Sequence, residues 1–138
     1  MESAIKAENL TKRYTSKNRA PAIEDVSFAI PQGILYGLVG PDGAGKTTIL
    51  RILSSVMNTT SGNAWVSGFN VRNQAEEVRR HLGYMPQNFS LYPDLNIMEN
   101  LNFFADIQHV PAAEKQQRIE EMLSITQLEK FTRSEAHR

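Results

Sequence analysis

Residues 34–56 read ILYGLVGPDGAGKTTILRILSSV, and the rest of the chain is best interpreted outward from this stretch. Its central residues, Gly40–Thr47, match the pattern G-x-x-x-x-G-K-S/T of a phosphate-binding loop. The nearly unbroken apolar run Ile34–Val39 predicts a strand buried on both faces. Apolar residues at helical spacing after the loop predict a helix over Lys46–Val56. Strand, glycine loop and helix together are the setting that this motif requires.

The residue types in the loop suit a bound polyphosphate. Gly43 and Gly45 can adopt backbone conformations closed to residues with a Cβ, so the loop can bend around an anion. Its consecutive N–H groups, together with the positive end of the following helix, then form an anion site. Lys46 supplies a full charge for the β- and γ-phosphates, and the Thr47 hydroxyl is a hard oxygen ligand for Mg²⁺. The sequence therefore predicts a nucleotide phosphate site, with a purely structural glycine turn as the alternative.

Length and composition fit one domain of ordinary size within 138 residues. The chain is 41% hydrophobic and 22% charged, with a mean hydropathy of −0.39, as in soluble globular proteins. No apolar run approaches the ~18 residues of a membrane span, and the N-terminus has no signal-peptide core. Fifteen basic and fifteen acidic residues balance, so no global field favours nucleic acid as a partner. The absence of cysteine agrees with a reducing compartment, and the cytoplasm is the expected location.

Short strands and helices are expected around the loop. Alternating or short apolar runs predict strands at Ile5–Leu10, Val26–Ile30, Ala64–Ser67 and Tyr84–Gln87. Residues that favour turns cluster at Pro31–Gly33 and Asn58–Asn63. Helical spacing predicts a short helix over Glu76–His81. A second helix is expected after Asn96, where Glu99 completes a capping box. A third is expected from Pro111, with an apolar face made of Ile119, Met122, Leu123 and Leu128.

Three motifs, in this order, resemble the N-terminal part of the ATP-binding domain of ABC transporters. They are Tyr14 after Leu-Thr-Lys-Arg, the loop Gly40–Thr48, and Leu82–Gln87, which reads LGYMPQ. The resemblance covers about residues 4 to 130 and is strongest to the ATPase subunits of bacterial drug-export systems. It implies an α/β P-loop NTPase fold of ABC type, with an antiparallel β-subdomain, a partial parallel core sheet and the start of a helical subdomain. Residues 1–138 would then be one such domain, incomplete at its C-terminus.

The resemblance also assigns roles in binding ATP and Mg²⁺. It implies that nucleotide is bound by Tyr14, Gly40, Pro41, Asp42, Gly43, Ala44, Gly45, Lys46, Thr47, Thr48 and Gln87. Tyr14 would stack on adenine, and Gln87 would join Thr47 on Mg²⁺ and hold the attacking water. Asp42 stands where the family often has asparagine, and its carboxylate is expected to point away from the phosphates. The alternatives are an ordinary strand-end tyrosine and a surface glutamine.

The sequence departs from the family after Gly83, beyond which it contains no glycine. A Leu-Ser-Gly-Gly-type signature is therefore not found. No apolar run of four ends in Asp-Glu, as a Walker B strand would, and no switch histidine is found. Because the catalytic carboxylate and the water-orienting groups are needed for phosphoryl transfer, no residue is assigned as catalytic. The chain alone is expected to bind ATP and to hydrolyse it poorly or not at all.

The implied biological role is coupling of ATP binding and hydrolysis to efflux. Expected partners are transmembrane permease subunits and a second ATP-binding domain, with the chain peripheral on the inner face of the cell membrane. The apolar segment Asn88–Pro93 is interpreted either as a docking surface for the membrane partner or as packing within the domain. Three alternatives remain open: a non-transport ABC ATPase, a non-catalytic nucleotide-binding fragment, and a small-molecule kinase with an arginine cluster at Arg72, Arg79 and Arg80.

Two further groups of residues are interpreted as surface features. The three histidines, His81, His109 and His137, lack partners at metal-ligand spacing. The acidic pairs Glu76-Glu77 and Glu120-Glu121 are expected to face Arg79-Arg80 and Lys115/Arg118 as solvated helix charges.

Overall fold

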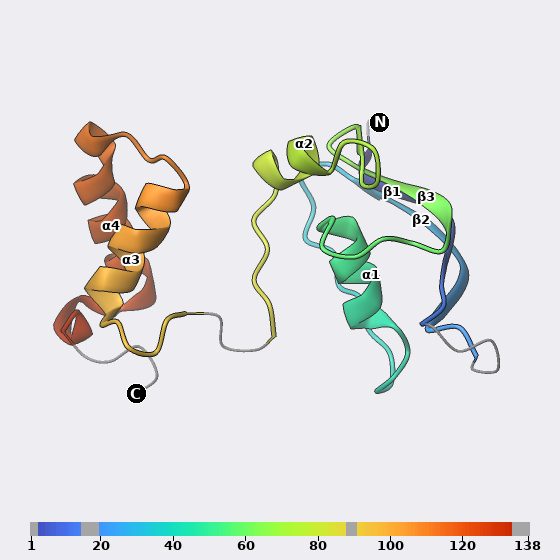
Figure 1. Ribbon diagram of the computed structural model, residues 1–138, viewed down its shortest axis with the longest axis horizontal. Coiled ribbons are helices and arrows are strands. Elements are labelled where there is room, and N and C mark those ends of the chain that lie inside the picture. The colour runs from blue at the N-terminus through green and yellow to red at the C-terminus, as the bar shows by residue number, and fades with distance from the viewer. Residues whose placement is uncertain (1–2, 15–19, 88–90, 134–138) are drawn as a thin grey trace. The chain divides into compact units, whose positions relative to one another are not determined.

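The computed structural model describes residues 3–14, 20–87 and 91–133. It divides the chain into two compact units, Met1–Met85 and Pro86–Arg138 (Figure 1). The first unit carries the predicted phosphate loop, and the second unit begins one residue before Gln87.

A four-stranded antiparallel sheet is the scaffold of the first unit. Its strands are β1 (Ser3–Lys12), β2 (Ile23–Pro31), β3 (Ser61–Val66) and β4 (Phe69–Asn70). They lie in the order β2-β1-β3-β4, so that Ala7 of β1 is opposite Phe28 on one side and Ala64 on the other. This sheet confirms the expected antiparallel subdomain, including the strands predicted near Ile5–Leu10, Val26–Ile30 and Ala64–Ser67.

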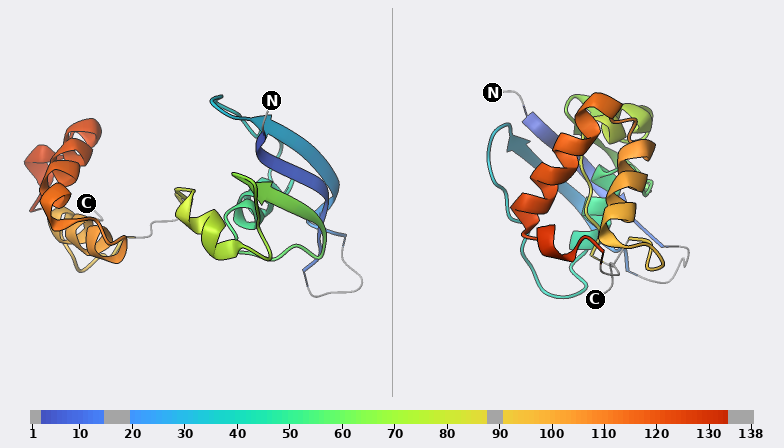
Figure 2. Two further views of the ribbon diagram at one scale, coloured as in Figure 1. Left: turned by 90° about the horizontal axis from the view of Figure 1, so that it is seen from above. Right: turned by 90° about the vertical axis from the view of Figure 1, so that its left-hand side faces the viewer.

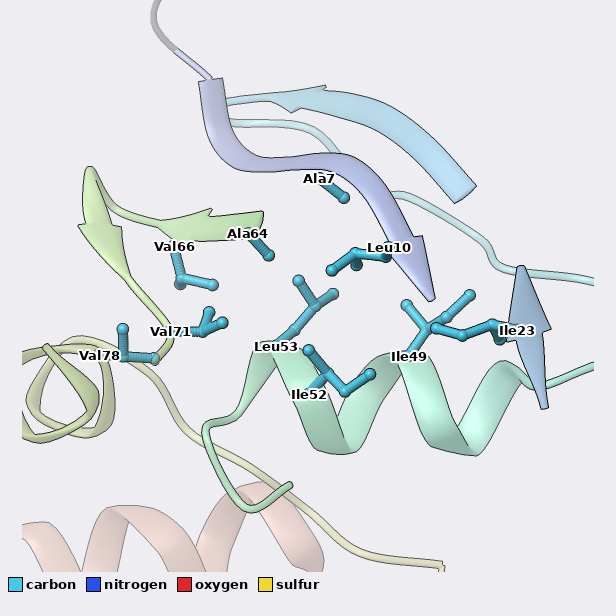
Figure 3. Close-up of a cluster of buried hydrophobic side chains, with 10 residues drawn as sticks. All are labelled: Ala7, Leu10, Ile23, Ile49, Ile52, Leu53, Ala64, Val66, Val71 and Val78. Carbon is cyan, nitrogen blue, oxygen red and sulfur yellow. The ribbon is translucent and has the colours of Figure 1, made fainter. Parts of the chain in front are cut away.

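Helix α1 (Lys46–Leu53) packs against the concave side of this sheet (Figure 2). Its Ile49, Ile52 and Leu53 side chains are buried and meet those of β1 and β3 in one hydrophobic cluster (Figure 3). The full cluster is Ala7, Leu10, Ile23, Ile49, Ile52, Leu53, Ala64, Val66, Val71 and Val78. Val78 comes from helix α2 (Ala75–Arg80), which agrees within one residue with the helix predicted over Glu76–His81. This cluster fixes the position of the helix that follows the phosphate loop.

The strand expected over Ile34–Val39 is not formed, and the prediction that both of its faces are buried is wrong. Leu35 and Val39 are 103% and 90% exposed. Ile34, Tyr36 and Leu38 instead line an apolar cavity of about 410 Å³ together with residues of β1, β2 and α1. No other described segment pairs with this run, and a strand requires a hydrogen-bonded neighbour. For the same reason the brief strand expected at Tyr84–Gln87 is absent, and Met85 is 93% exposed.

Two element boundaries differ from the sequence prediction. Helix α1 ends at Leu53 rather than Val56, because Ser55 adopts a left-handed backbone with φ 55°. Strand β3 begins at Ser61, within the predicted turn Asn58–Asn63, because its first residues pair with β1. The strand pairing therefore overrides the local preference of serine, glycine and asparagine for turns. The two-residue strand β4 was not predicted.

The second unit is built on two helices, α3 (Ile97–Ile107) and α4 (Ala112–Thr126), followed by the 3₁₀ turn η1 (Glu129–Phe131). The predicted capping box is confirmed: the Asn96 side chain accepts from the Glu99 N–H at 2.9 Å, and the Glu99 carboxylate accepts from the Asn96 N–H at 2.8 Å. The start of α4 after Pro111 is also confirmed. Ile119 and Leu123 are buried as expected, whereas Met122 is 50% exposed because it lies off the contact face.

Asn100 anchors the segment that leads into α3. The residue is only 2% exposed, and its amide group donates to the carbonyl oxygens of Tyr92, Leu95 and Asn96 at 3.0–3.1 Å. Its Oδ1 accepts from the Tyr92 N–H at 2.9 Å. A single buried side chain therefore bonds four backbone groups of this turn.

We expect Asn100→Ala to weaken the second unit by about 2–4 kcal/mol, because the Leu95 carbonyl and the Tyr92 N–H would each lose a part-buried side-chain hydrogen bond. Hydrogen exchange of the α3 and α4 amides would show this as a loss of protection. Asn102→Ala is the matched control, since Asn102 is half-buried and donates only to Met98 O one turn earlier. Equal losses in the two variants would contradict the anchoring role.

Candidate functional site

The phosphate loop has the backbone that its glycines were predicted to allow. Gly43 and Gly45 have φ of 80° and 89°, in the left-handed region that favours glycine. Gly45 is also confined by its neighbours, because a Cβ there would lie 2.3 Å from Ile23 Cγ2 and 2.5 Å from Ala22 O. The loop therefore bends sharply and lies directly against the start of β2.

The N-terminus of α1 is open to an anion. Gly45 is its N-cap and supplies no side-chain hydrogen bond, and the first turn contains no acidic residue. The first backbone N–H groups of a helix have no intrahelical acceptors. They point at the loop with the partial positive charge of the helix behind them. These donors fit a phosphate group, which supplies acceptor oxygens and negative charge at the same place.

Lys46 reaches back over the loop. Its Nζ donates to Gly40 O at 2.7 Å and to Pro41 O at 2.8 Å. An ammonium group has three N–H donors, so one remains for a further acceptor. Asp42 is exposed, and among the described residues it forms no ion pair with Lys46. The positive charge at the loop is therefore not neutralised by the nearby carboxylate, in line with the expectation that Asp42 points away.

The two threonines after Lys46 differ in their surroundings. Thr47 is exposed, so its hydroxyl is accessible to a metal ion carried by a nucleotide. Thr48 is 8% exposed, and its Oγ1 lies 3.2 Å from the Tyr14 hydroxyl. The structure thus connects Tyr14 to the first turn of α1, across 34 residues of sequence.

Tyr14 has two neighbours that the sequence reasoning missed. Its hydroxyl donates to Met57 Sδ at 3.3 Å, and the Lys12 ammonium lies 5.7 Å from the centre of its ring. The ring is 47% exposed, so part of it remains free to contact a ligand. Lys12 could have been found, because residues i and i+2 of an extended chain share a face. Met57 follows the end of α1, and no sequence pattern pairs it with Tyr14.

Gln87 and the apolar segment after it belong to the second unit. Gln87 is exposed, and its predicted role on Mg²⁺ and water stays a prediction. Residues 88–90 of the candidate docking segment lie outside the described residues. The Tyr92 ring packs edge-on against Phe103, with centroids 4.8 Å apart, which favours packing within the domain for this residue.

The remaining candidates behave mostly as surface groups. His81 Nδ1 is hydrogen-bonded to Glu77 O, and no set of metal-ligating side chains gathers anywhere in the described part of the chain. His137 lies outside that part. Arg80 forms ion pairs with Glu76 and Glu77, as predicted.

The predicted partners of Glu120-Glu121 are wrong. Their carboxylates accept hydrogen bonds from Gln116 and Gln117, one helical turn earlier. The cations expected to face them are engaged elsewhere: Lys115 with Asp106, and Arg118 with Glu114. Within residues 3–14, 20–87 and 91–133, no helix has the length and apolar character needed to cross a membrane.

Comparison with known proteins identifies relatives along nearly the whole chain. The model of a family described as ABC transporter matches residues 23–138. The chain is 40% identical over 131 residues to the probable multidrug ABC transporter ATP-binding protein YbhF of Escherichia coli (strain K12), covering 95% of this chain and 22% of that protein. It is 38% identical over 128 residues to the probable sulfate/thiosulfate import ATP-binding protein CysA of Chlorella vulgaris, covering 93% and 52%.

A solved structure extends the comparison to the fold. The dimeric post-hydrolysis state of the ATP-binding cassette MJ0796, bound to ADP and Pi, matches with a TM-score of 0.82 at 24% identity, over 96% of this chain and 62% of that one. This likeness confirms the predicted P-loop fold class of ABC type. The partial parallel core sheet that was also predicted is not formed by the described residues, whose single sheet is antiparallel because the run Ile34–Val39 has no strand beside it. The chain spans about a fifth of YbhF and about half of CysA, so it corresponds to only part of these relatives.

Proposed function

The chain belongs to the ABC transporter family, whose model matches residues 23–138, and from that premise we propose that it is the ATP-binding part of an exporter. Domains of this family bind ATP and work with transmembrane subunits. Beyond family membership, the proposal states which residues bind the nucleotide, in which direction the substrate is transported and how fast this chain hydrolyses ATP. Membership of this family also sets aside the small-molecule kinase, whose candidate Arg80 is already paired with glutamates.

The observation that carries the proposal is the open N-terminus of α1 beneath Lys46. Gly40–Thr48 would hold the β- and γ-phosphates through backbone N–H groups and through the free N–H of Lys46. Tyr14 would stack on adenine with the exposed part of its ring. A single neutral side chain would bind a triphosphate weakly. Several backbone N–H donors and one ammonium group together match the charge and the shape of a triphosphate.

Magnesium would enter with the nucleotide. The exposed Thr47 hydroxyl is a hard oxygen donor next to the phosphate site, and Mg²⁺ prefers few protein ligands together with phosphate oxygens and water. Gln87 would provide a second oxygen from its side-chain amide. The ion would neutralise phosphate charge, while the chain's own residues bind and orient the nucleotide.

We further propose that the 138-residue chain turns ATP over slowly. A phosphoryl transfer site needs a group that orients the attacking water, in addition to phosphate and metal contacts. The sequence offers Gln87 but no Asp-Glu pair after an apolar run, and no glycine-rich signature beyond Gly83. Binding without appreciable hydrolysis is therefore the expected behaviour of this chain by itself.

The exporter assignment rests on the motifs and on the 40% identity to YbhF, a probable multidrug protein. Export would require transmembrane permease subunits and a second ATP-binding domain, with this chain on the inner face of the membrane. The dimeric MJ0796 cassette supports pairing of two such domains. The importer CysA, at 38% identity, makes import the second candidate for the direction of transport.

Calorimetric titration with MgATP tests the central claim. We expect saturable binding of one nucleotide, together with phosphate release close to the background rate. Rapid hydrolysis by the purified chain would contradict the proposal of slow turnover. A folded chain that binds no MgATP would contradict the nucleotide site itself. Fractionation of cells that express the chain would test its class. A transporter subunit should co-purify with the membranes, whereas a non-transport ABC ATPase should remain in the supernatant.

A further inference from the structure

We infer that the segment Met57–Thr60, which follows α1, is a positioning element that holds the Tyr14 ring at a fixed place relative to the phosphate loop. The inference rests on the proposed function, because it concerns how the adenine-stacking ring is oriented once the loop binds ATP. It assigns roles to Met57, Asn58 and Lys12, which have no part in the phosphate site.

The Tyr14 hydroxyl is held from two sides. A thioether sulfur only accepts hydrogen bonds, so the single hydroxyl proton of Tyr14 is directed at Met57 Sδ, 3.3 Å away. The contact with Thr48 Oγ1, at 3.2 Å, must then have Thr48 as donor and Tyr14 as acceptor. The hydroxyl thus links the first turn of α1 to the residues just beyond its C-terminus.

The backbone before Tyr14 is fixed by the same segment. Thr60 N–H donates to Thr11 O at 2.9 Å, and the Thr59 hydroxyl shares its single proton between Thr11 O and Ser61 O. Thr60 Oγ1 accepts from the Arg13 N–H at 3.0 Å. These contacts hold the end of β1 against residues 59–60, so the backbone just before Tyr14 and the Tyr14 hydroxyl are both positioned by one short segment.

Lys12 completes the arrangement beside the ring. Its Nζ donates to Asn58 O at 2.6 Å while lying 5.7 Å from the Tyr14 ring centre, a distance suited to a cation–π contact. A cation fixed on one side of the ring leaves the opposite side for a base. A platform held in this way loses little freedom when the base stacks, and such preorganisation improves affinity.

Tyr14→Phe tests the inference, because it keeps the stacking ring and removes only the hydroxyl. Affinities for MgATP and for magnesium tripolyphosphate, which has no base, would both be measured by calorimetry on the full chain. We expect the ratio of MgATP to tripolyphosphate affinity to fall roughly two- to tenfold, as for the loss of one neutral hydrogen bond. Met57→Leu, which removes the acceptor and keeps the volume, should lower the same ratio by a smaller factor.

Tyr84→Phe is the matched control, since the Tyr84 ring is 39% exposed and no hydrogen bond joins its hydroxyl to another described residue. It should leave the ratio unchanged. An unchanged ratio in Tyr14→Phe, or equal losses for both ligands, would overturn the positioning role while the nucleotide site stands. Failure of the unaltered chain to bind either ligand would overturn the proposed function, and this inference with it.

Discussion

Lys46→Ala is expected to reduce MgATP affinity about ten- to a hundredfold, because it removes both the charge and its hydrogen-bond donors. The Lys46 ammonium is the full positive charge that the structure places over the loop, bonded to the carbonyls of Gly40 and Pro41. Removing it would leave the backbone N–H groups of α1 to face the phosphates alone. Calorimetry of the variant beside the unaltered chain would measure the difference.

Lys6→Ala is the control for a general loss of charge. Lys6 lies on β1, is 52% exposed at its side chain and pairs with Glu8, so its removal should leave MgATP affinity unchanged. Circular dichroism would verify that both variants remain folded, because the Lys6 ammonium lies 5.7 Å from the ring centre of Trp65, the single tryptophan, and its removal would itself alter the Trp65 fluorescence. Comparable losses in Lys6→Ala would mean that nucleotide is attracted by diffuse charge rather than by the loop.

The phosphate loop was predictable because its chemistry is local. The left-handed backbone at Gly43 and Gly45 and the helix that begins at Lys46 both depend on consecutive residues, and the structure shows both. The capping box at Asn96 was predictable for the same reason, since both partners lie within one helical turn. The contact of Tyr14 with Met57 joins residues 43 positions apart, and no local rule predicts it.

The run Ile34–Val39 shows what could not be predicted from local sequence. Its apolar composition predicted burial, yet Ile34, Tyr36 and Leu38 are 37–53% exposed and only line an open apolar cavity. Strand formation additionally needs hydrogen-bonded neighbours, which a single segment cannot specify. The prediction failed at the step that depends on other parts of a sheet, and the same holds for Tyr84–Gln87.

Gly45→Ala is expected to destabilise the first unit by more than about 3 kcal/mol and to abolish MgATP binding. Two costs combine here. An L-residue at φ 89° loses about 1–2 kcal/mol to backbone strain. The new Cβ would also lie 2.5 Å from the Ala22 carbonyl oxygen, which is backbone and cannot rotate away. Urea unfolding followed by Trp65 fluorescence would measure the loss.

Gly43→Ala separates these two costs. Gly43 has nearly the same left-handed backbone, φ 80°, but an added Cβ there meets no atom within 4 Å. It should therefore lose only the strain of about 1–2 kcal/mol. If the two variants unfold alike, the contact between the loop and the start of β2 contributes nothing. A clear excess for Gly45→Ala would mean that this glycine serves two purposes, bending the loop around an anion and letting α1 approach the sheet that holds it in place.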